Sequence, residues 1–317
     1  MIYLILTVQH RTQQEVNYLF VLKMIRYIII VTLGALSYGM LSSFAKIAYG
    51  QGYNAGEITF VQALVGAAFL WLIVLIRNFR TEKYKLKINW KLLLAGSTMG
   101  ISAYTYYLSV QYIPASLAIV LLMQITWMSV LAEWLLFKKK PSSVELIAIL
   151  FIIGGTMLAG NLTNVQALNL SPIGILLGLT ASLLYTLYVI FTSKLGNDTP
   201  MFEKSALMTT GSALMILLIN LKSITTSSHL DLGLLQWGSF LALFGTIIPP
   251  ICFTKGMPKI GPGMSAILLT LELPAAIFCA HIILDEDVSF LQIIGIIIML
   301  GAIIFLNKAK ERKEENK

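Results

Sequence analysis

Long apolar segments, repeated along most of the chain, constrain its fold more than any other feature. Of the 317 residues, 57% are hydrophobic and only 12% are charged, and most charges lie in short clusters between the apolar segments. A soluble domain carries about 25% charged residues. An apolar run of about 20 residues is long enough to cross the hydrocarbon core of a bilayer as a helix. The sequence therefore predicts an all-α integral membrane protein.

The spans are expected to be helices, because the other structure that crosses membranes is a closed barrel whose strands alternate apolar and polar residues. Segments such as "QIIGIIIMLGAIIFL", residues 292–306, do not alternate. We predict ten transmembrane helices, at about 26–47, 56–77, 91–111, 114–137, 143–160, 172–193, 204–221, 233–256, 261–284 and 289–307.

Positive charges are confined almost entirely to alternate connections. With an internal N-terminus, the external side receives only Lys46 and Lys222, and every other Lys and Arg falls on the internal side. Short basic loops stay in the cytoplasm. We therefore expect both termini to be cytoplasmic and the protein to be a multi-pass protein of the cytoplasmic (cell) membrane. Basic loops at a membrane surface also account for the net charge of +8 without a nucleic acid partner.

The second half of the chain resembles the first at a constant offset of 147 residues. "LLFKKKPSS" (Leu135–Ser143) aligns with "IILDEDVSF" (Ile282–Phe290), so three positive residues correspond to three negative ones, and Tyr38 aligns with Tyr185. A repeat of five spans re-enters the membrane from the opposite side, so the same corner is cytoplasmic in one copy and external in the other. Inverted repeats of this kind are typical of secondary transporters, with the substrate site near the midplane.

The sequence divides into four parts. Residues 26–160 are predicted to form the first five-helix repeat, 172–307 the second, and 308–317 a charged cytoplasmic tail. Residues 1–23 contain an apolar run too short to span, without the features of a signal peptide. We expect this N-terminal extension to derive from an upstream start codon, ahead of Met24, or to lie at the membrane interface.

The chain resembles the drug/metabolite transporter (DMT) superfamily, and within it permeases of the EamA type. The resemblance is carried by the two five-span units with their short corners, by Glu272 and Pro274 in the middle of span nine, by Gln124 in span four and by Lys46 late in span one. It covers about residues 26–307. It implies a fold of two inverted EamA repeats. One departure is Gln62, where many relatives carry an arginine, and this disfavours a strongly anionic substrate.

The function implied by the resemblance is secondary transport of a small organic metabolite or drug-like solute by alternating access, with export driven by an ion gradient, such as a proton gradient. An alternative is a flippase for lipids or lipid-linked sugars. A membrane-embedded enzyme is a third reading, but the short loops are poor in the His and Asp that catalysis would need. We expect no enzymatic activity, no cofactor and no metal, and either a monomer or a homodimer.

Glu272 is the sharpest candidate for a site residue. A carboxylate in the middle of a span costs roughly 2.5–3.5 kcal/mol on insertion scales, so it should be protonated, hydrogen-bonded or exposed to a watery cavity. It could bind a proton or a substrate amine, or it could tie two helices together as a neutral acid. The Gln124 amide has the same two readings, a substrate contact or a bond to a neighbouring helix. Glu133, later in that span and near the cytoplasm, is expected to belong to the interface with Lys138.

Aromatic residues form a second group of candidates, because a tyrosine deep in a span needs a partner for its hydroxyl. Lining of a substrate cavity and anchoring or packing are both open readings. The candidates are Tyr38, Tyr185, Tyr188, Tyr106 and Trp127.

The remaining candidates lie near the ends or breaks of spans. Lys46 could attract substrate at the outer mouth or simply extend its ammonium to the interface. Pro249, Pro250 and Pro274 could kink their helices and act as gates or hinges, although proline is common in membrane helices.

Overall fold

The computed structural model describes residues 24–81, 88–113, 115–160, 171–225, 231–285 and 287–315, and all regular secondary structure in these ranges is helical. The extension predicted at residues 1–23 lies outside the described residues. The segment predicted as a tail begins as a continuation of the last helix, α14 (Phe290–Glu315).

Each half of the chain contributes a similar series of helices. The first half opens with a helix over residues 24–39. It continues with α2 (Leu41–Gly50), α3 (Ala55–Thr81), α4 (Trp90–Tyr112), α5 (Ala115–Leu122), α6 (Ile125–Phe137) and α7 (Ser143–Ala159). The second half contains α8 (Pro172–Lys194), α9 (Met201–Thr225), α10 (Leu232–Ala242), the π-helical turn η2 (Leu243–Ile247), α11 (Ile248–Ile260), α12 (Pro262–Leu269), α13 (Glu272–Leu284) and α14.

The helix boundaries reproduce the offset of 147 residues found in the sequence. Moved by this offset, the bounds of α5 become those of α12, the bounds of α6 become those of α13, and the start of α7 becomes the start of α14. In both halves the fourth predicted span is therefore broken at the same place, between two short helices. The backbone repeats although few side chains at matched positions are identical.

The corner at which the charges invert has the same backbone structure in both copies. Lys138 and Asp285 end α6 and α13 in the left-handed conformation, with φ of 54° and 51°, and they are the only non-glycine residues with positive φ among those described. Four residues later, Ser142 and Ser289 cap the next helix, and each Oγ accepts a backbone N–H at 3.3 Å. The geometry is set by the backbone, so the exposed side chains are free to carry either charge.

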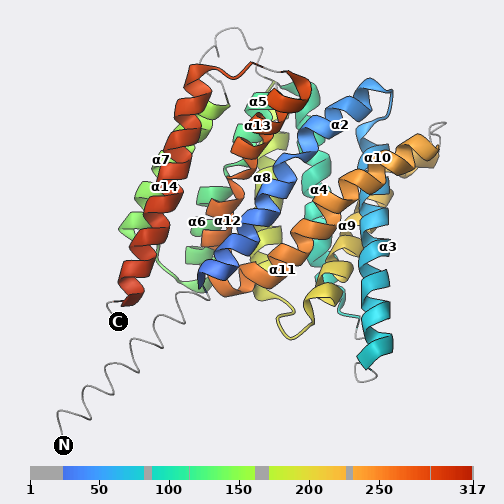
Figure 1. Ribbon diagram of the computed structural model, residues 1–317, viewed down its shortest axis with the longest axis horizontal. Coiled ribbons are helices and arrows are strands. Elements are labelled where there is room, and N and C mark those ends of the chain that lie inside the picture. Colours follow the sequence, from blue (N-terminus) through green and yellow to red (C-terminus); the bar gives the residue numbers. More distant parts are fainter. Residues whose placement is uncertain are drawn as a thin grey trace, which may run out of the picture.

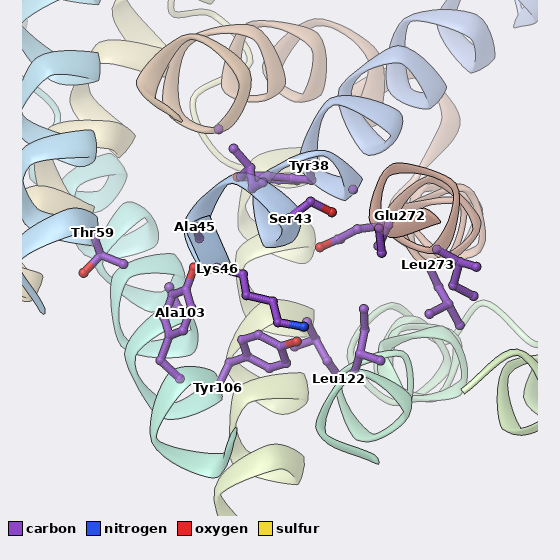
Figure 2. Close-up of a pocket in the computed structure, with 18 of the residues that line it drawn as sticks. Tyr38, Ser43, Ala45, Lys46, Thr59, Ala103, Tyr106, Leu122, Glu272 and Leu273 are labelled. Carbon is purple, nitrogen blue, oxygen red and sulfur yellow. The ribbon is translucent and has the colours of Figure 1, made fainter. Parts of the chain in front are cut away.

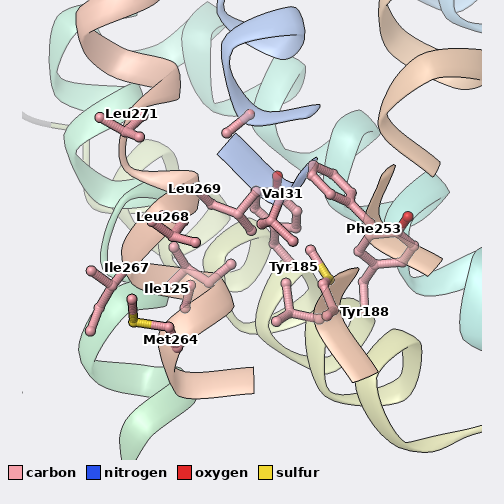
Figure 3. Packing of buried hydrophobic residues seen from close by; sticks show 14 of the residues in the cluster. Val31, Ile125, Tyr185, Tyr188, Phe253, Met264, Ile267, Leu268, Leu269 and Leu271 are labelled. Atoms are coloured by element: carbon pink, nitrogen blue, oxygen red, sulfur yellow. The ribbon is translucent and has the colours of Figure 1, made fainter. Parts of the chain in front are cut away.

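The helices pack as a bundle around α8 (Figure 1). α8 packs against α4, α4 against α9, and α9 against α3, while α7 and α14 pair along one edge. The largest apolar core contains Ile125 of α6, Tyr188 of α8, Phe253 of α11 and Leu268 of α12 (Figure 3). This core joins helices of both halves.

Seven helical segments are long and apolar enough to cross a membrane, counted among the described residues. The two shorter apolar helices, Ser143–Ala159 and Phe290–Leu306, coincide with predicted spans five and ten, and α4 coincides with span three. The chain is thus a multi-pass membrane protein, and the crossing by all ten predicted spans stays a prediction. The seven segments are Met24–Gly50, Ala55–Asn78, Leu117–Phe137, Pro172–Lys194, Met201–Lys222, Leu232–Ile260 and Pro262–Leu284.

Candidate functional site

A cavity of about 680 Å³ lies between the two halves of the chain (Figure 2). Its wall is formed by the first helix, α2, α3, α4 and α5 from one half, and by α8, α9, η2, α13 and the start of α14 from the other. Small-molecule sites occupy cavities of about 300–1,000 Å³, mostly apolar with a few placed polar groups. The size and position of this cavity suit a small organic molecule.

Glu272 points into this cavity from the first turn of α13 (Figure 2). α13 begins there because the chain breaks at Thr270 and Leu271, and because Pro274 is at the third helical position. In the first turn of a helix the missing N–H of proline costs no hydrogen bond. The helix N-terminus also favours a negative charge. Oε2 of Glu272 is buried without a hydrogen-bond partner among the described residues.

Three of the tyrosines predicted from sequence line the cavity: Tyr38, Tyr106 and Tyr185. Tyr38 and Tyr185 occupy equivalent positions in the two halves, and both are buried. The Tyr185 hydroxyl has no hydrogen-bond partner among the described residues. Tyr188 does not line the cavity and instead packs behind Tyr185, with ring centroids 6.2 Å apart.

Lys46 extends into the cavity from α2 (Figure 2). The carboxylate of Asp287, in the connection before α14, belongs to the same wall. Among the described wall residues, the formal charges are therefore one lysine and two acids, Glu272 and Asp287. The cavity wall thus carries a basic residue on α2 and acidic residues on α13 and the connection that follows it.

Gln124 and Trp127 lie at the break between α5 and α6 and do not line the cavity. The amide of Gln124 donates to the carbonyl of Val120 at 2.9 Å and accepts the indole N–H of Trp127 at 2.8 Å. Trp127 belongs to a separate pocket of about 410 Å³, together with Trp134 and Lys140. The two side chains thus hydrogen-bond to each other and to the backbone of the broken span, not to the cavity.

Pro249 and Pro250 lie in the first turn of α11, directly after the π-helical turn η2. The π-helical turn interrupts the α-helical hydrogen-bond pattern here, and the two prolines follow it at the N-terminal positions of α11. It carries Gly245 and Thr246 into the cavity wall, and Thr246 Oγ1 donates to the carbonyl of Gln62 on α3 at 2.9 Å. Such π-helical irregularities occur frequently at functional sites.

Sequence reasoning missed several small polar residues of the wall. Hydroxyl groups within apolar spans commonly bond a carbonyl of their own helix, so the sequence gives no sign of which ones face a cavity. Gln62, noted only as a departure from relatives, also lines the cavity. The missed hydroxyl residues are Ser43, Thr59, Ser102, Ser212 and Thr246.

Comparisons with known proteins agree with a transport function. The sequence profile of the EamA-like transporter family matches residues 25–161 and again 172–308. The chain is 24% identical over 294 residues to the uncharacterized transporter YcbK of Bacillus subtilis (strain 168), over 90% of this chain and 93% of that protein. A crystal structure of another protein, 12% identical, matches with a TM-score of 0.72 over 89% of this chain and 97% of that chain, which shows the fold alone. The chain therefore belongs to the EamA-like transporter family, of the drug/metabolite transporter superfamily, and contains two EamA repeats.

Proposed function

We propose that this protein is a secondary transporter that moves a small organic metabolite or drug-like solute across the cytoplasmic membrane by alternating access. The observation that carries the proposal is the cavity between the two repeats, which is walled by Tyr38 and Tyr185 at equivalent positions and by the carboxyl of Glu272. Inverted repeats place a shared substrate site at their interface. The family points to a transporter rather than an enzyme.

Ten crossings by two inverted repeats, with both termini in the cytoplasm, belong to this proposal. In Figure 1, α5 lies above α6 whereas α12 lies below α13, so the two broken spans run in opposite directions. The first described helix begins, and α14 ends, at the same end of the bundle. These orientations support the inverted topology. The confinement of basic residues to one side supports a cytoplasmic location for both termini.

Glu272 is proposed as the coupling site, with a proton as the coupling ion and export as the direction. Its position at the cavity wall and its buried, unpartnered Oε2 support this role. A carboxyl in such surroundings gains from taking up either a proton or a cationic group of the substrate, because an unsatisfied buried polar atom is costly. Competition between the proton and the substrate for this carboxyl would couple their movements across the membrane.

The test is transport into proteoliposomes with and without a pH gradient, using pooled amino acids and organic cations as substrates. Glu272→Gln keeps the size and hydrogen bonding of the side chain but removes its titration. We expect the variant to insert at normal yield, to exchange substrate across the membrane, and to lose accumulation driven by the gradient. The matched control is Glu203→Gln, because Glu203 also has a buried, unpartnered Oε2 but does not line the cavity.

The results of this experiment distinguish a coupling role of Glu272 from a structural role and from a lipid flippase. Accumulation by Glu272→Gln at the parent's level would remove Glu272 as the coupling site. Failure of the variant to insert would favour a carboxyl that ties helices together. Transbilayer movement of labelled lipid, without uptake of any soluble substrate, would favour the flippase.

A further inference from the structure

Glu133 joins the two repeats where α6 packs against α12. This contact lies at the opposite end of the bundle from α5 and α13, the equivalent helices under the repeat (Figure 1). Glu133 lies late in α6, and its side chain is buried, with 7% of the residue exposed. Oε2 accepts the backbone N–H of Gly263, in the first turn of α12, at 3.1 Å. Oε1 accepts a hydrogen bond from the ammonium of Lys139 at 2.9 Å. One carboxylate therefore binds both the basic corner of the first repeat and a helix start in the second.

The backbone of the second repeat is shaped to admit this carboxylate. A Cβ at Gly263 would lie 2.6 Å from Glu133 Oε2 and 3.2 Å from Val130 Cγ2, so a larger residue would displace the contact. Gly261 precedes α12 with a φ of +84°, a conformation that other residues rarely adopt. A carboxylate at a helix N-terminus is also favoured by the helix dipole. The contact is thus a close fit between the two repeats.

The equivalent seam at the opposite end of the bundle is open. Position 133 corresponds to Ala280 at the offset of 147, and Ala280 lines the cavity. Ile119 and Leu122 of α5 and Ala276 of α13 line the same cavity, and within the described residues α5 and α13 do not pack along each other as α6 and α12 do. At the other end, α6 packs directly against α12. The α6–α12 contact thus carries a buried carboxylate, whereas at the α5–α13 position the equivalent residue is an alanine that lines the cavity.

We propose that Glu133 is a latch that holds the α6–α12 seam closed in this conformation, and that breaking its bond to Gly263 is a required step in opening that end of the cavity. The inference rests on the proposed alternating access for its role in transport. Glu133 is a positioning residue here, since it does not line the cavity. The basic corner beside it, Lys138–Lys140, identifies the latched end as the proposed cytoplasmic end.

The latch is tested by labelling single cysteines in protein held in lipid nanodiscs, with a water-soluble maleimide that reaches both faces. The two native cysteines, Cys252 and Cys279, are first replaced by serine. Ser129→Cys reports on the closed seam, because Ser129 lies one helical turn before Glu133 and is 0% exposed. Ala280→Cys reports on the open seam. The parent is expected to label at Ala280→Cys and to resist labelling at Ser129→Cys.

In Glu133→Ala, labelling of Ser129→Cys is expected to accelerate roughly ten- to a hundredfold, as expected for loss of a buried hydrogen bond to a charged group. Labelling of Ala280→Cys is expected to slow at the same time, because opening of one seam closes the other. Gly263→Ala should act in the same direction without changing Glu133. Lys139→Ala should shift the ratio by less than about fivefold, because its side chain is 58% exposed and exposed ion pairs contribute little.

Glu57→Ala is the matched control. Glu57 is as buried as Glu133, at 1% exposed, and its Oε2 also accepts a backbone N–H, that of Asn54, at 2.9 Å. This bond lies at the start of its own helix, so the variant should lose stability without changing the labelling ratio.

Unchanged labelling of both cysteines in Glu133→Ala would overturn the latch. Faster labelling of both together would also overturn it, because it would show general loosening rather than exchange between two open ends. The labelling needs no substrate. If Ser129→Cys labels faster and Ala280→Cys labels slower in a protein that shows no transport, the latch is supported and the proposed transport function is contradicted.

Discussion

Gly96 lies at a close crossing of two helices, and the distances there predict how much an alanine would destabilise the fold. α4 and α9 cross in close contact, and a Cβ at Gly96 would lie 1.8 Å from the carbonyl oxygen of Met208. On the facing helix, a Cβ at Gly211 would lie 1.9 Å from the carbonyl oxygen of Leu93. Small residues at such crossings let membrane helices approach closely. The Cβ added by Gly96→Ala must therefore push the backbone of α9 away from α4.

The size of the effect follows from these distances. Ordinary contact begins at 3.4 Å, so the two helices would have to separate by about 1.6 Å at the crossing. Overpacking of a core costs about 1–3 kcal/mol, and the upper end applies because a carbonyl in a helix cannot rotate away. At roughly 2–4 °C per kcal/mol, a loss of about 3 kcal/mol lowers the midpoint of thermal unfolding by roughly 6–12 °C.

The assay is thermal unfolding in detergent, followed by circular dichroism and by retention of the monodisperse peak in size-exclusion chromatography. Gly154→Ala is the control, because a Cβ there would meet no atom within 4 Å other than its chain neighbours and the nearby backbone of its own helix. We expect this control to unfold within about 0.5 kcal/mol of the parent. Equal midpoints for the two variants would refute the packing argument. Transport by Gly96→Ala should also fall, since α4 carries Met99 and Tyr106 into the cavity wall.

Two further predictions concern the membrane topology and the hydrogen bond between Tyr53 and Asp231. A reporter active only outside the cytoplasm should be active when fused after Asp287 and silent when fused after Lys140, and the reverse pattern would exclude the inverted topology. The Tyr53 hydroxyl donates to the Asp231 carboxylate at 2.9 Å, and this bond raises the pKa of Tyr53. Its stabilising contribution is therefore complete below the unfolded value of about 10 and is lost as the pH rises through the folded value. Ultraviolet titration of Asp231→Ala, compared with Tyr53→Phe to identify the Tyr53 signal, should show a lower Tyr53 pKa, and an unchanged pKa would contradict this assignment.

Much of the architecture was predictable because it depends on local chemistry that repeats along the chain. Apolar runs long enough to span a bilayer leave the backbone no alternative to helix. The charge inversion between Lys138 and Asp285 indicated a repeated corner, and both residues have the same left-handed conformation in the structure. Tyr38, Tyr185 and Glu272 were identifiable as unusual polar groups deep in apolar segments, and they line one cavity.

The rest depended on which helix faces meet, and an isolated apolar segment does not encode this. Gln124 and Trp127 looked equivalent to the cavity residues in sequence, but the broken span turns them toward each other. Gly96 and Gly154 are both glycines in predicted spans, yet one lies against a carbonyl and the other beside open space. Membrane helices carry little amphipathic pattern, because lipid and protein interior are equally apolar. The sequence by itself therefore determined the helices, the repeat and the buried charge. Only the tertiary structure decided which hydroxyls line the cavity and that Glu133 of one repeat binds the backbone of Gly263 in the other, because those depend on distances between helices far apart in the chain.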